Sequence, residues 1–295
     1  IEENISYQEF QELLDNYSFY QDDLVGDEVG IPLYFLGKKT KNSKIKVVQV
    51  GEGADELFYG YDHWNRYLKL NKFFKPFFKS TKKYSSFKNH RLNMLSNILF
   101  NRTSFAGGDL GFNLKELDSL IEDGLPNHSD LIFYADNKWK DYFSNKNSKI
   151  SKWMTLIDLK IRLPELLLMR MDKLVMQSAV EARVPFLDHK LVEYVLSLPE
   201  ELLIDLTNTK SLLKKVAIKY LPDQIINRKK QGFRAPIGEW IKKDEEKFYE
   251  SVQQFNSLVN LFNERELNHI LNGNDYQKKW YLINLSNWHL ARVAN

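Results

Sequence analysis

A short apolar strand that leads directly into a glycine turn with three carboxylates is the feature that most restricts how this chain can fold. The strand covers residues 45–50, and the turn after it reads Gly51-Glu52-Gly53-Ala54-Asp55-Glu56-Leu57-Phe58. Glycine lets a backbone approach an oxyanion, a helix start offers unpaired N–H groups, and carboxylates hold the Mg²⁺ that bridges phosphates. The segment therefore predicts a nucleotide site with magnesium, although glycine with acids is also common in ordinary turns.

The residues around this turn predict part of an α/β fold. Apolar residues recur at helical spacing over residues 29–42, and the strand at 45–50 is short and β-branched, which suits a buried parallel strand. A parallel sheet needs several strands, yet the chain offers only a weak further candidate near residues 202–206. We therefore expect the later part of a nucleotide-binding fold, with its early strands missing.

Beyond Phe58 the chain is expected to be mostly helical. Apolar periodicity and the positions of glycine and proline separate the remaining helices from one another. They cover residues 61–70, 85–100, 114–121, 129–143, 152–163, 164–178, 189–198, 209–220, 243–255, 264–271 and 276–291.

Composition excludes several classes of function. The 295 residues contain no cysteine, so disulfides, thiolate metal sites and a cysteine nucleophile are ruled out. The six histidines are scattered without paired helical spacing, which argues against a metal hydrolase. Because no apolar stretch is long enough to cross a bilayer and no signal peptide opens the sequence, a cytoplasmic location without membrane contact is the default expectation.

The basic residues are unevenly distributed. Residues 65–102 hold ten lysines and arginines and no acid, interleaved with aromatic side chains. Such a stretch is compatible with nucleic-acid binding, but a helical hairpin with its aromatic residues inside and its lysines in water is the simpler interpretation. We therefore expect no nucleic-acid partner, and the role of this stretch stays open.

Two further segments carry cations that suit phosphates. Arg170, Lys173 and Gln177 fall on one face of an expected helix, from which a lysine and an arginine one turn apart can meet a phosphate. Surface pairing with nearby acids is the alternative. Glu181 and Arg183 follow in a segment expected to be extended, where a buried structural ion pair is the simpler interpretation.

The other segment, residues 228–236, places four cations in seven residues around a glycine. Arg228, Lys229 and Lys230 precede Gly232, and Arg234 follows it. A mobile loop of this kind can fold over a polyanion, although a charged surface loop is the ordinary alternative.

In their order and spacing, these segments resemble the synthetase domain of the glutamine-hydrolysing asparagine synthetases. The resemblance is carried by Gly-Glu-Gly-Ala-Asp-Glu-Leu-Phe at 51–58, by Asp172-Lys173 with Val-Glu-Ala-Arg-Val-Pro-Phe-Leu-Asp at 180–188, and by the Arg-x-Lys-x-Gly-Phe segment at 228–233. The acidic stretch with Asp22, Asp23 and Asp27 before Ile31-Pro32 is also similar. The similarity covers about residues 20–62 and 150–241.

This resemblance implies an α/β fold of the adenine-nucleotide alpha-hydrolase-like (Rossmann-like) type, a parallel sheet truncated at its amino end with a large, predominantly helical remainder. Residues 1–62 would end the nucleotide-binding core, residues 63–150 would form a basic helical insertion, and residues 151–295 would complete the active site. Enzymes of this family use ATP and Mg²⁺ to adenylate a carboxylate and release pyrophosphate, and ammonia then displaces AMP to give an amide.

The resemblance also implies roles for single residues. Asp55 is implied as the ligand of magnesium and pyrophosphate, and Glu52 as the group that positions the acyl-adenylate or takes a proton from ammonia. Lys173 and Lys230 are implied to contact phosphates, with Lys230 stabilising charge on the α-phosphate. The expected nucleotide-binding set is completed by Gly51, Gly53 and Arg228.

Departures from the family pattern limit what this chain is expected to do alone. The Ser-Gly-Gly-x-Asp-Ser loop that cradles ATP is absent, and so is the glutaminase domain with its cysteine nucleophile. We therefore expect part of a ligase that is inactive by itself and receives ammonia from a glutaminase domain outside this chain.

The acceptor and the assembly stay open. Glu28 and Val50 stand where authentic asparagine synthetases usually have other residues, so the aspartate side chain is only the first choice among small carboxylate substrates. The alternatives are a related amidotransferase acting on a sugar uronate or another carboxylate, and a non-catalytic helical binding module. A homodimer is compatible with the sequence, which does not decide the oligomeric state.

Overall fold

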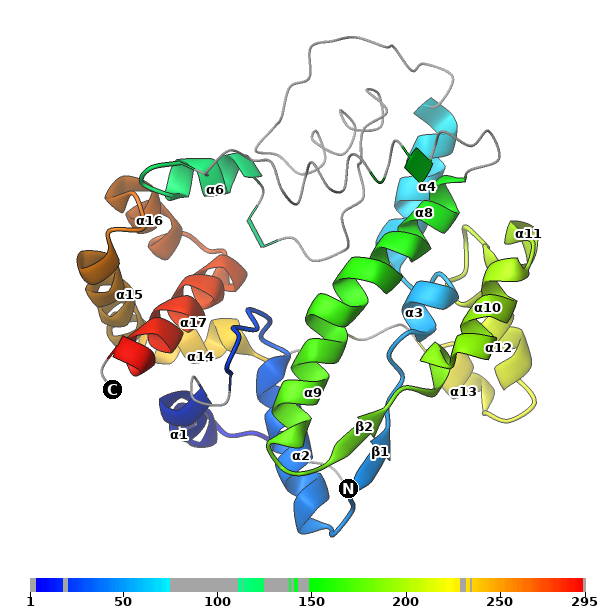
Figure 1. The fold of residues 1–295 in the computed structure, drawn as a ribbon, viewed down its shortest axis with the longest axis horizontal. Coiled ribbons are helices and arrows are strands. Elements are labelled where there is room, and N and C mark those ends of the chain that lie inside the picture. The colour runs from blue at the N-terminus through cyan, green and yellow to red at the C-terminus, as the bar shows by residue number, and fades with distance from the viewer. Residues whose placement is uncertain are drawn as a thin grey trace.

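The structure is a computed structural model that describes residues 4–17, 21–74, 111–112, 114–124, 138, 141–142, 149–228, 232–233 and 235–293. The described part is mostly helical and contains one small parallel sheet (Figure 1). A long helix runs through the molecule, and further helices lie on each side of it (Figure 1). Within these ranges, no helix combines the length and the apolar character needed to span a bilayer.

The sheet joins two strands that are far apart in the sequence. β1 (Val47–Gln49) pairs in parallel with β2 (Glu181–Arg183), so that Val48 stands opposite Ala182. Two parallel strands need a long crossover, and here it includes the long helix. This small parallel sheet among helices is consistent with an α/β fold. The weak strand candidate near 202–206 was wrong, because α11 (Glu200–Leu203) begins after a proline with two acids in its first turn.

The long helix is continuous from Ile150 to Met176. It consists of α8 (Ile150–Ile157), the π-helical segment η2 (Asp158–Leu168) and α9 (Met169–Met176). A boundary between two helices at Pro164 was therefore a wrong expectation. Proline lacks an N–H and crowds the preceding turn of an α-helix, and the wider π-helical turn around Pro164 accommodates both effects.

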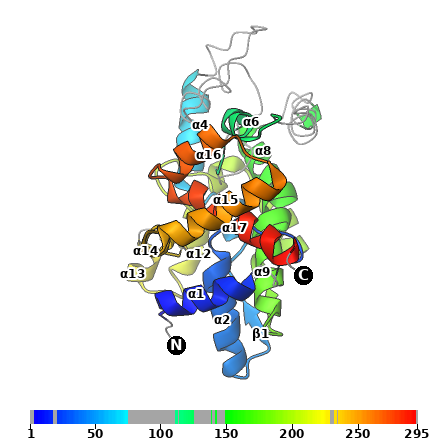
Figure 2. The same cartoon turned by 90° about the vertical axis from the view of Figure 1, so that its left-hand side faces the viewer.

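One hydrophobic core lies on the side of the long helix that carries the C-terminus. It contains side chains of α1 (Tyr7–Tyr17), α2 (Gly30–Asn42), α9, α14 (Ile237–Lys243), α15 (Glu245–Val259), α16 (Glu264–Leu271) and α17 (Tyr276–Val293). Phe10 and Trp240 stack at its centre with ring centroids 4.4 Å apart. Figure 2 views the molecule from the side that this group forms.

A second core lies on the other side. It contains side chains of α3 (Ala54–Leu57), α4 (Asp62–Phe74), α8, α10 (His189–Ser197), α11 and α12 (Ser211–Ala217). Trp64 is fully buried within it. The turn between β1 and α3 therefore sits where the long helix, the sheet and this core meet (Figure 1).

Most helices expected from the sequence are present. Those expected at 29–42, 114–121, 189–198, 264–271 and 276–291 are confirmed, the second as α6 (Leu114–Leu120). α12 is shorter than expected and is followed by α13 (Asp223–Ile226), while α1 and α14 were not expected. The expected helix at 85–100, most of that at 129–143 and much of the basic stretch lie outside the described residues. The division into three parts stays a prediction.

Candidate functional site

The acidic turn after β1 is shaped by Gly53. This residue has a φ of 90°, a left-handed conformation that favours glycine. A Cβ atom here would also lie 2.4 Å from the Leu187 Cδ2 atom. Glycine is therefore required for α3 to begin directly after the strand, and this start carries the three carboxylates of the turn. Each of them pairs with its own cation, two from the long helix and one from the residue that precedes α12.

Glu52 faces Arg170 of α9, with its Oε1 atom 3.7 Å from Nη2. Only 8% of Arg170 is exposed, and its guanidinium group also forms an ion pair with Asp27 in the loop before α2. Burial raises the pKa of the Glu52 carboxyl. The Arg170 guanidinium opposes this rise in pKa, whereas the Glu56 and Asp55 carboxylates add to it. A carboxylate in this setting is a better proton acceptor than a solvated one.

Asp55 forms an ion pair with Lys210, in which Oδ2 and Nζ are 3.0 Å apart. Lys210 directly precedes α12, and its N–H donates to the Tyr59 carbonyl at 3.4 Å. Gly60 makes room for the pair, because a Cβ atom there would lie 2.0 Å from Asp55 Oδ1 and 2.4 Å from Lys210 Cε. Since 22% of the Asp55 side chain and 26% of the Lys210 side chain remain exposed, a ligand can reach both.

Glu56 is buried, unlike the other two acids. The Tyr61 hydroxyl donates to its carboxylate, and Arg162 Nη1 lies 3.6 Å from it. Arg162 also donates to the Tyr61 hydroxyl at 3.0 Å and pairs with Asp158 at 3.1 Å. Burial raises the pKa of the Tyr61 phenol, which keeps it a proton donor. Because Thr155 of α8 also donates to the Glu56 carbonyl at 3.3 Å, this network ties the acidic turn to the long helix.

The residues assigned to phosphates from the sequence have different environments. Lys173 pairs with Asp22, whose side chain is 85% exposed. An exposed ion pair is weak, so an anionic ligand can replace Asp22 as the partner of Lys173. Arg228 is exposed after α13, and Lys230 lies outside the described residues. Gly51 is exposed, with open space where a Cβ atom would stand, so a ligand can approach its backbone.

The ion pair of Glu181 and Arg183 is present but is not buried as expected. The carboxylate and the guanidinium group are 3.0 Å apart, and their side chains are 54% and 63% exposed. Residues two apart on a strand point to the same face, and in β2 this face is open to solvent.

The acids of the turn do not form a metal cage on their own. In the described ranges, no three side chains of histidine, cysteine, aspartate or glutamate come together in a way that could hold a metal ion. Magnesium is commonly held by one or two carboxylates together with phosphate oxygens. The Asp55 carboxylate is therefore compatible with a magnesium ion that is bound jointly with a phosphate ligand. In this structure, Asp55 forms an ion pair with Lys210 instead.

The structure thus brings Glu52 and Asp55 together with Arg170 and Lys210, whereas a role of Lys230 at this site stays a prediction. Neither Lys210 nor Arg162 was expected at the acidic turn. Both contacts join parts of the chain that are far apart in sequence, and no local pattern marks them.

The chain is similar to known proteins over most of its length. The family model described as asparagine synthase matches residues 1–290. Asparagine synthetase (glutamine-hydrolysing) 1 of Bacillus subtilis (strain 168) is 30% identical to the chain, over 85% of this chain and 40% of the relative. A putative asparagine synthetase (glutamine-hydrolysing) of Mycobacterium bovis is 29% identical, over 99% of this chain and 46% of the relative. The chain therefore spans less than half the length of these relatives.

Proposed function

Because the chain belongs to the asparagine synthase family, we propose that it forms part of the active site of an ATP-dependent ligase that converts a carboxylate into an amide. The relatives are named as glutamine-hydrolysing asparagine synthetases, so the aspartate side chain is the proposed acceptor and glutamine the proposed source of ammonia. Since this chain has no cysteine, the glutaminase step is assigned to protein outside it.

The observation that carries this proposal is the pairing of each acid of the turn with a cation from elsewhere in the chain. Three carboxylates stand within five residues, and each pairs with a different cation. The pairs are Glu52–Arg170, Asp55–Lys210 and Glu56–Arg162. Two of these acids, Glu52 and Asp55, remain partly exposed. The arrangement supports a reaction in which negative charge must be neutralised and a proton removed, as in acyl adenylation followed by attack of ammonia.

Glu52 is proposed to act on the ammonia step. When ammonia attacks the acyl carbon, the bond to AMP breaks and the nitrogen must lose a proton. The raised pKa of the Glu52 carboxyl makes it a suitable acceptor of that proton. Arg170 holds the carboxylate from the side of α9, so that Glu52 keeps its position as its charge changes.

Asp55 is proposed to hold magnesium, which when bound neutralises charge on the leaving pyrophosphate. Lys210 would then be released from Asp55 and could donate to phosphate oxygens, a role that suits a compact ammonium group. Lys173 and Lys230 are proposed as further phosphate contacts. The proposed nucleotide-binding set is completed by Gly51, Gly53 and Arg228.

Adenylation is tested by following an ¹⁸O label from the carboxylate of the acceptor into AMP. The protein that carries this chain is supplied with ATP, Mg²⁺, glutamine and aspartate labelled with ¹⁸O in its side-chain carboxylate. Because the carboxylate oxygen attacks the α-phosphorus, one labelled oxygen must appear in AMP. Label in inorganic phosphate instead would indicate an acyl phosphate and would overturn the proposal.

The same assay separates the alternatives. A label that appears in AMP only with a sugar uronate or another carboxylate would point to a related amidotransferase. If no acceptor transfers oxygen to AMP while nucleotide still binds, the chain is a binding module. Asp55→Asn serves as the control, because it removes the proposed magnesium ligand and should suppress label transfer with any acceptor.

A further inference from the structure

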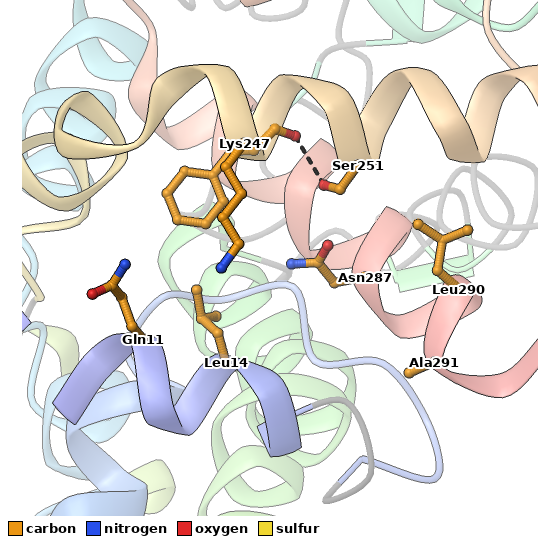
Figure 3. Close-up of a pocket in the computed structure, with 8 residues that line it drawn as sticks. Gln11, Leu14, Lys247, Ser251, Asn287, Leu290 and Ala291 are labelled. Carbon is orange, nitrogen blue, oxygen red and sulfur yellow. Dashed lines mark hydrogen bonds between the residues drawn. The ribbon is translucent and has the colours of Figure 1, made fainter. Parts of the chain in front are cut away.

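A pocket lies between α1, α15 and α17, on the opposite side of the long helix from the acidic turn (Figures 1 and 3). Its volume is about 220 Å³. α1 contributes Gln11 and Leu14, α15 contributes Lys247, and α17 contributes Asn287 and Leu290 to its lining. This space has no part in the proposed amide-forming reaction.

One part of the pocket offers hydrogen-bond donors. Figure 3 shows the Lys247 ammonium and the Asn287 amide pointing into the same space above Leu14. Within the described residues, Lys247 forms no ion pair. Gln11 donates to the Asp244 carboxylate at 2.6 Å, so the amide donor of Gln11 already has a partner. An anion is therefore the complementary group for this part of the pocket.

The other part of the pocket is apolar. Leu14, Leu290 and Ala291 line it, together with Phe248 from α15. A cavity of about 220 Å³ has room for a short aliphatic chain but not for a nucleotide. We propose that the pocket binds a small carboxylate with a short apolar tail, its carboxylate at Lys247 and Asn287.

The helix that lines this pocket also holds the loop that precedes α2. Asn284 of α17 donates to the Val25 carbonyl at 2.9 Å. Trp288 donates to the Gln21 carbonyl at 2.9 Å, and Arg292 donates to the same carbonyl. The turns of α17 that contain Asn287, Leu290 and Ala291 therefore contact the pocket on one side and this loop on the other.

The loop in turn supplies partners for the cations of α9. Asp22 pairs with Lys173, and Asp27 pairs with Arg170, which faces Glu52. A carboxylate that fixes α17 against α1 and α15 would therefore steady the loop and, through Arg170, the acidic turn. An effect of this carboxylate on amide formation rests on the proposed function, whereas the binding site itself does not.

Binding is tested by an NMR titration of the chain with pentanoate, pentan-1-ol and acetate. Pentanoate should bind more tightly than the other two, because the alcohol lacks the charge and acetate lacks the tail. Lys247→Met should weaken pentanoate binding about tenfold or more. Lys190→Met, an exposed lysine of α10, is the matched control and should leave it unchanged.

Two results would overturn the site. They are equal binding of pentanoate and pentan-1-ol, and unchanged pentanoate binding in Lys247→Met. Asn287→Leu gives a second check, since it removes the amide while keeping the number and branching of the side-chain heavy atoms, and it should also weaken pentanoate binding. Lys247 is exposed, so its replacement should not prevent folding.

The link from the pocket to the loop before α2 is tested by hydrogen exchange of residues 21–29. Pentanoate should slow exchange of the Val25 N–H, which donates to the Gln21 side chain at 2.6 Å. The effect should be lost in Lys247→Met. Binding without a change in exchange would refute the link. This measurement needs no ATP and no amide formation, so its failure is distinct from a failure of the proposed function.

Discussion

Lys210 places its ammonium 3.0 Å from the Asp55 carboxylate, although the two residues come from distant parts of the chain. The pair explains how three acids can share one short turn. Like charges at such spacing repel one another, and each additional carboxylate would destabilise the turn without a cation nearby. The other two acids are compensated in the same way, by the pairs Glu52–Arg170 and Glu56–Arg162.

The first prediction concerns this pair. Lys210→Met should lower the free energy of unfolding by about 1–2 kcal/mol, because a partly buried carboxylate is left without its cation. A double-mutant cycle with Asp55→Asn, measured by urea unfolding at neutral pH, should give a coupling energy of about 1 kcal/mol. Lys190→Met is the surface control. Additive effects of the two replacements would show that the ion pair contributes nothing.

The second prediction concerns the glycines of the acidic turn. Gly53→Ala should lower the free energy of unfolding by at least about 2 kcal/mol, because it forces a side chain into a left-handed conformation and against Leu187. Gly51→Ala is the matched control, with open space at its Cβ position, and should change stability by less than about 0.5 kcal/mol. Thermal unfolding compares the two variants. Equal losses would contradict the structure.

The third prediction concerns pH. Burial raises the pKa of the Glu52 carboxyl above its ordinary value of 4.5, so the folded chain binds this proton more tightly than the unfolded chain does. The resulting stability is fully present below the ordinary pKa and is lost as pH rises through the raised pKa. Relative to Glu52→Gln, the wild-type chain should therefore lose stability as pH rises from the ordinary pKa of 4.5 through the raised pKa.

Urea unfolding at several pH values measures this difference. Glu181→Gln is a control of opposite sign, because Arg183 lowers the pKa of the exposed Glu181 carboxyl. That ion pair contributes stability above the ordinary pKa, which is lost as pH falls. A difference between wild type and Glu52→Gln that stays flat with pH would refute the raised pKa of Glu52.

Local signals were enough to predict the core of the candidate site. Helix α2, strand β1 and the glycine turn follow one another within about thirty residues, and each has a pattern that short-range physics determines. Gly53 is an example, because the left-handed backbone of a tight turn favours glycine before any distant contact is considered. The turn could therefore be placed before its partners were known. The strand is, however, shorter than expected, and Val47 is exposed where a buried strand was expected.

The partners of the acids could not be predicted, because they depend on packing between distant segments. Arg170 was expected to meet a phosphate from its helix face, but its position beside Glu52 follows from how α9 packs against α2. Pro164 was interpreted as a helix boundary because local rules treat proline as a helix breaker. The π-helical turn that accommodates this proline depends on the helix continuing on both sides of it.

The last prediction separates Lys230 from its neighbour. In the protein that carries this chain, Lys230→Ala should abolish pyrophosphate release and leave glutamine hydrolysis intact, because the lysine is proposed to stabilise charge on the α-phosphate. Loss of one such contact commonly costs a factor of about 100–1,000 in turnover. Lys229→Ala removes the same charge one residue away and should cost much less, since a point charge acts at a defined position. Pyrophosphate release that persists in Lys230→Ala, or equal losses in both variants, would exclude a specific role for Lys230 and leave the segment as a charged surface loop.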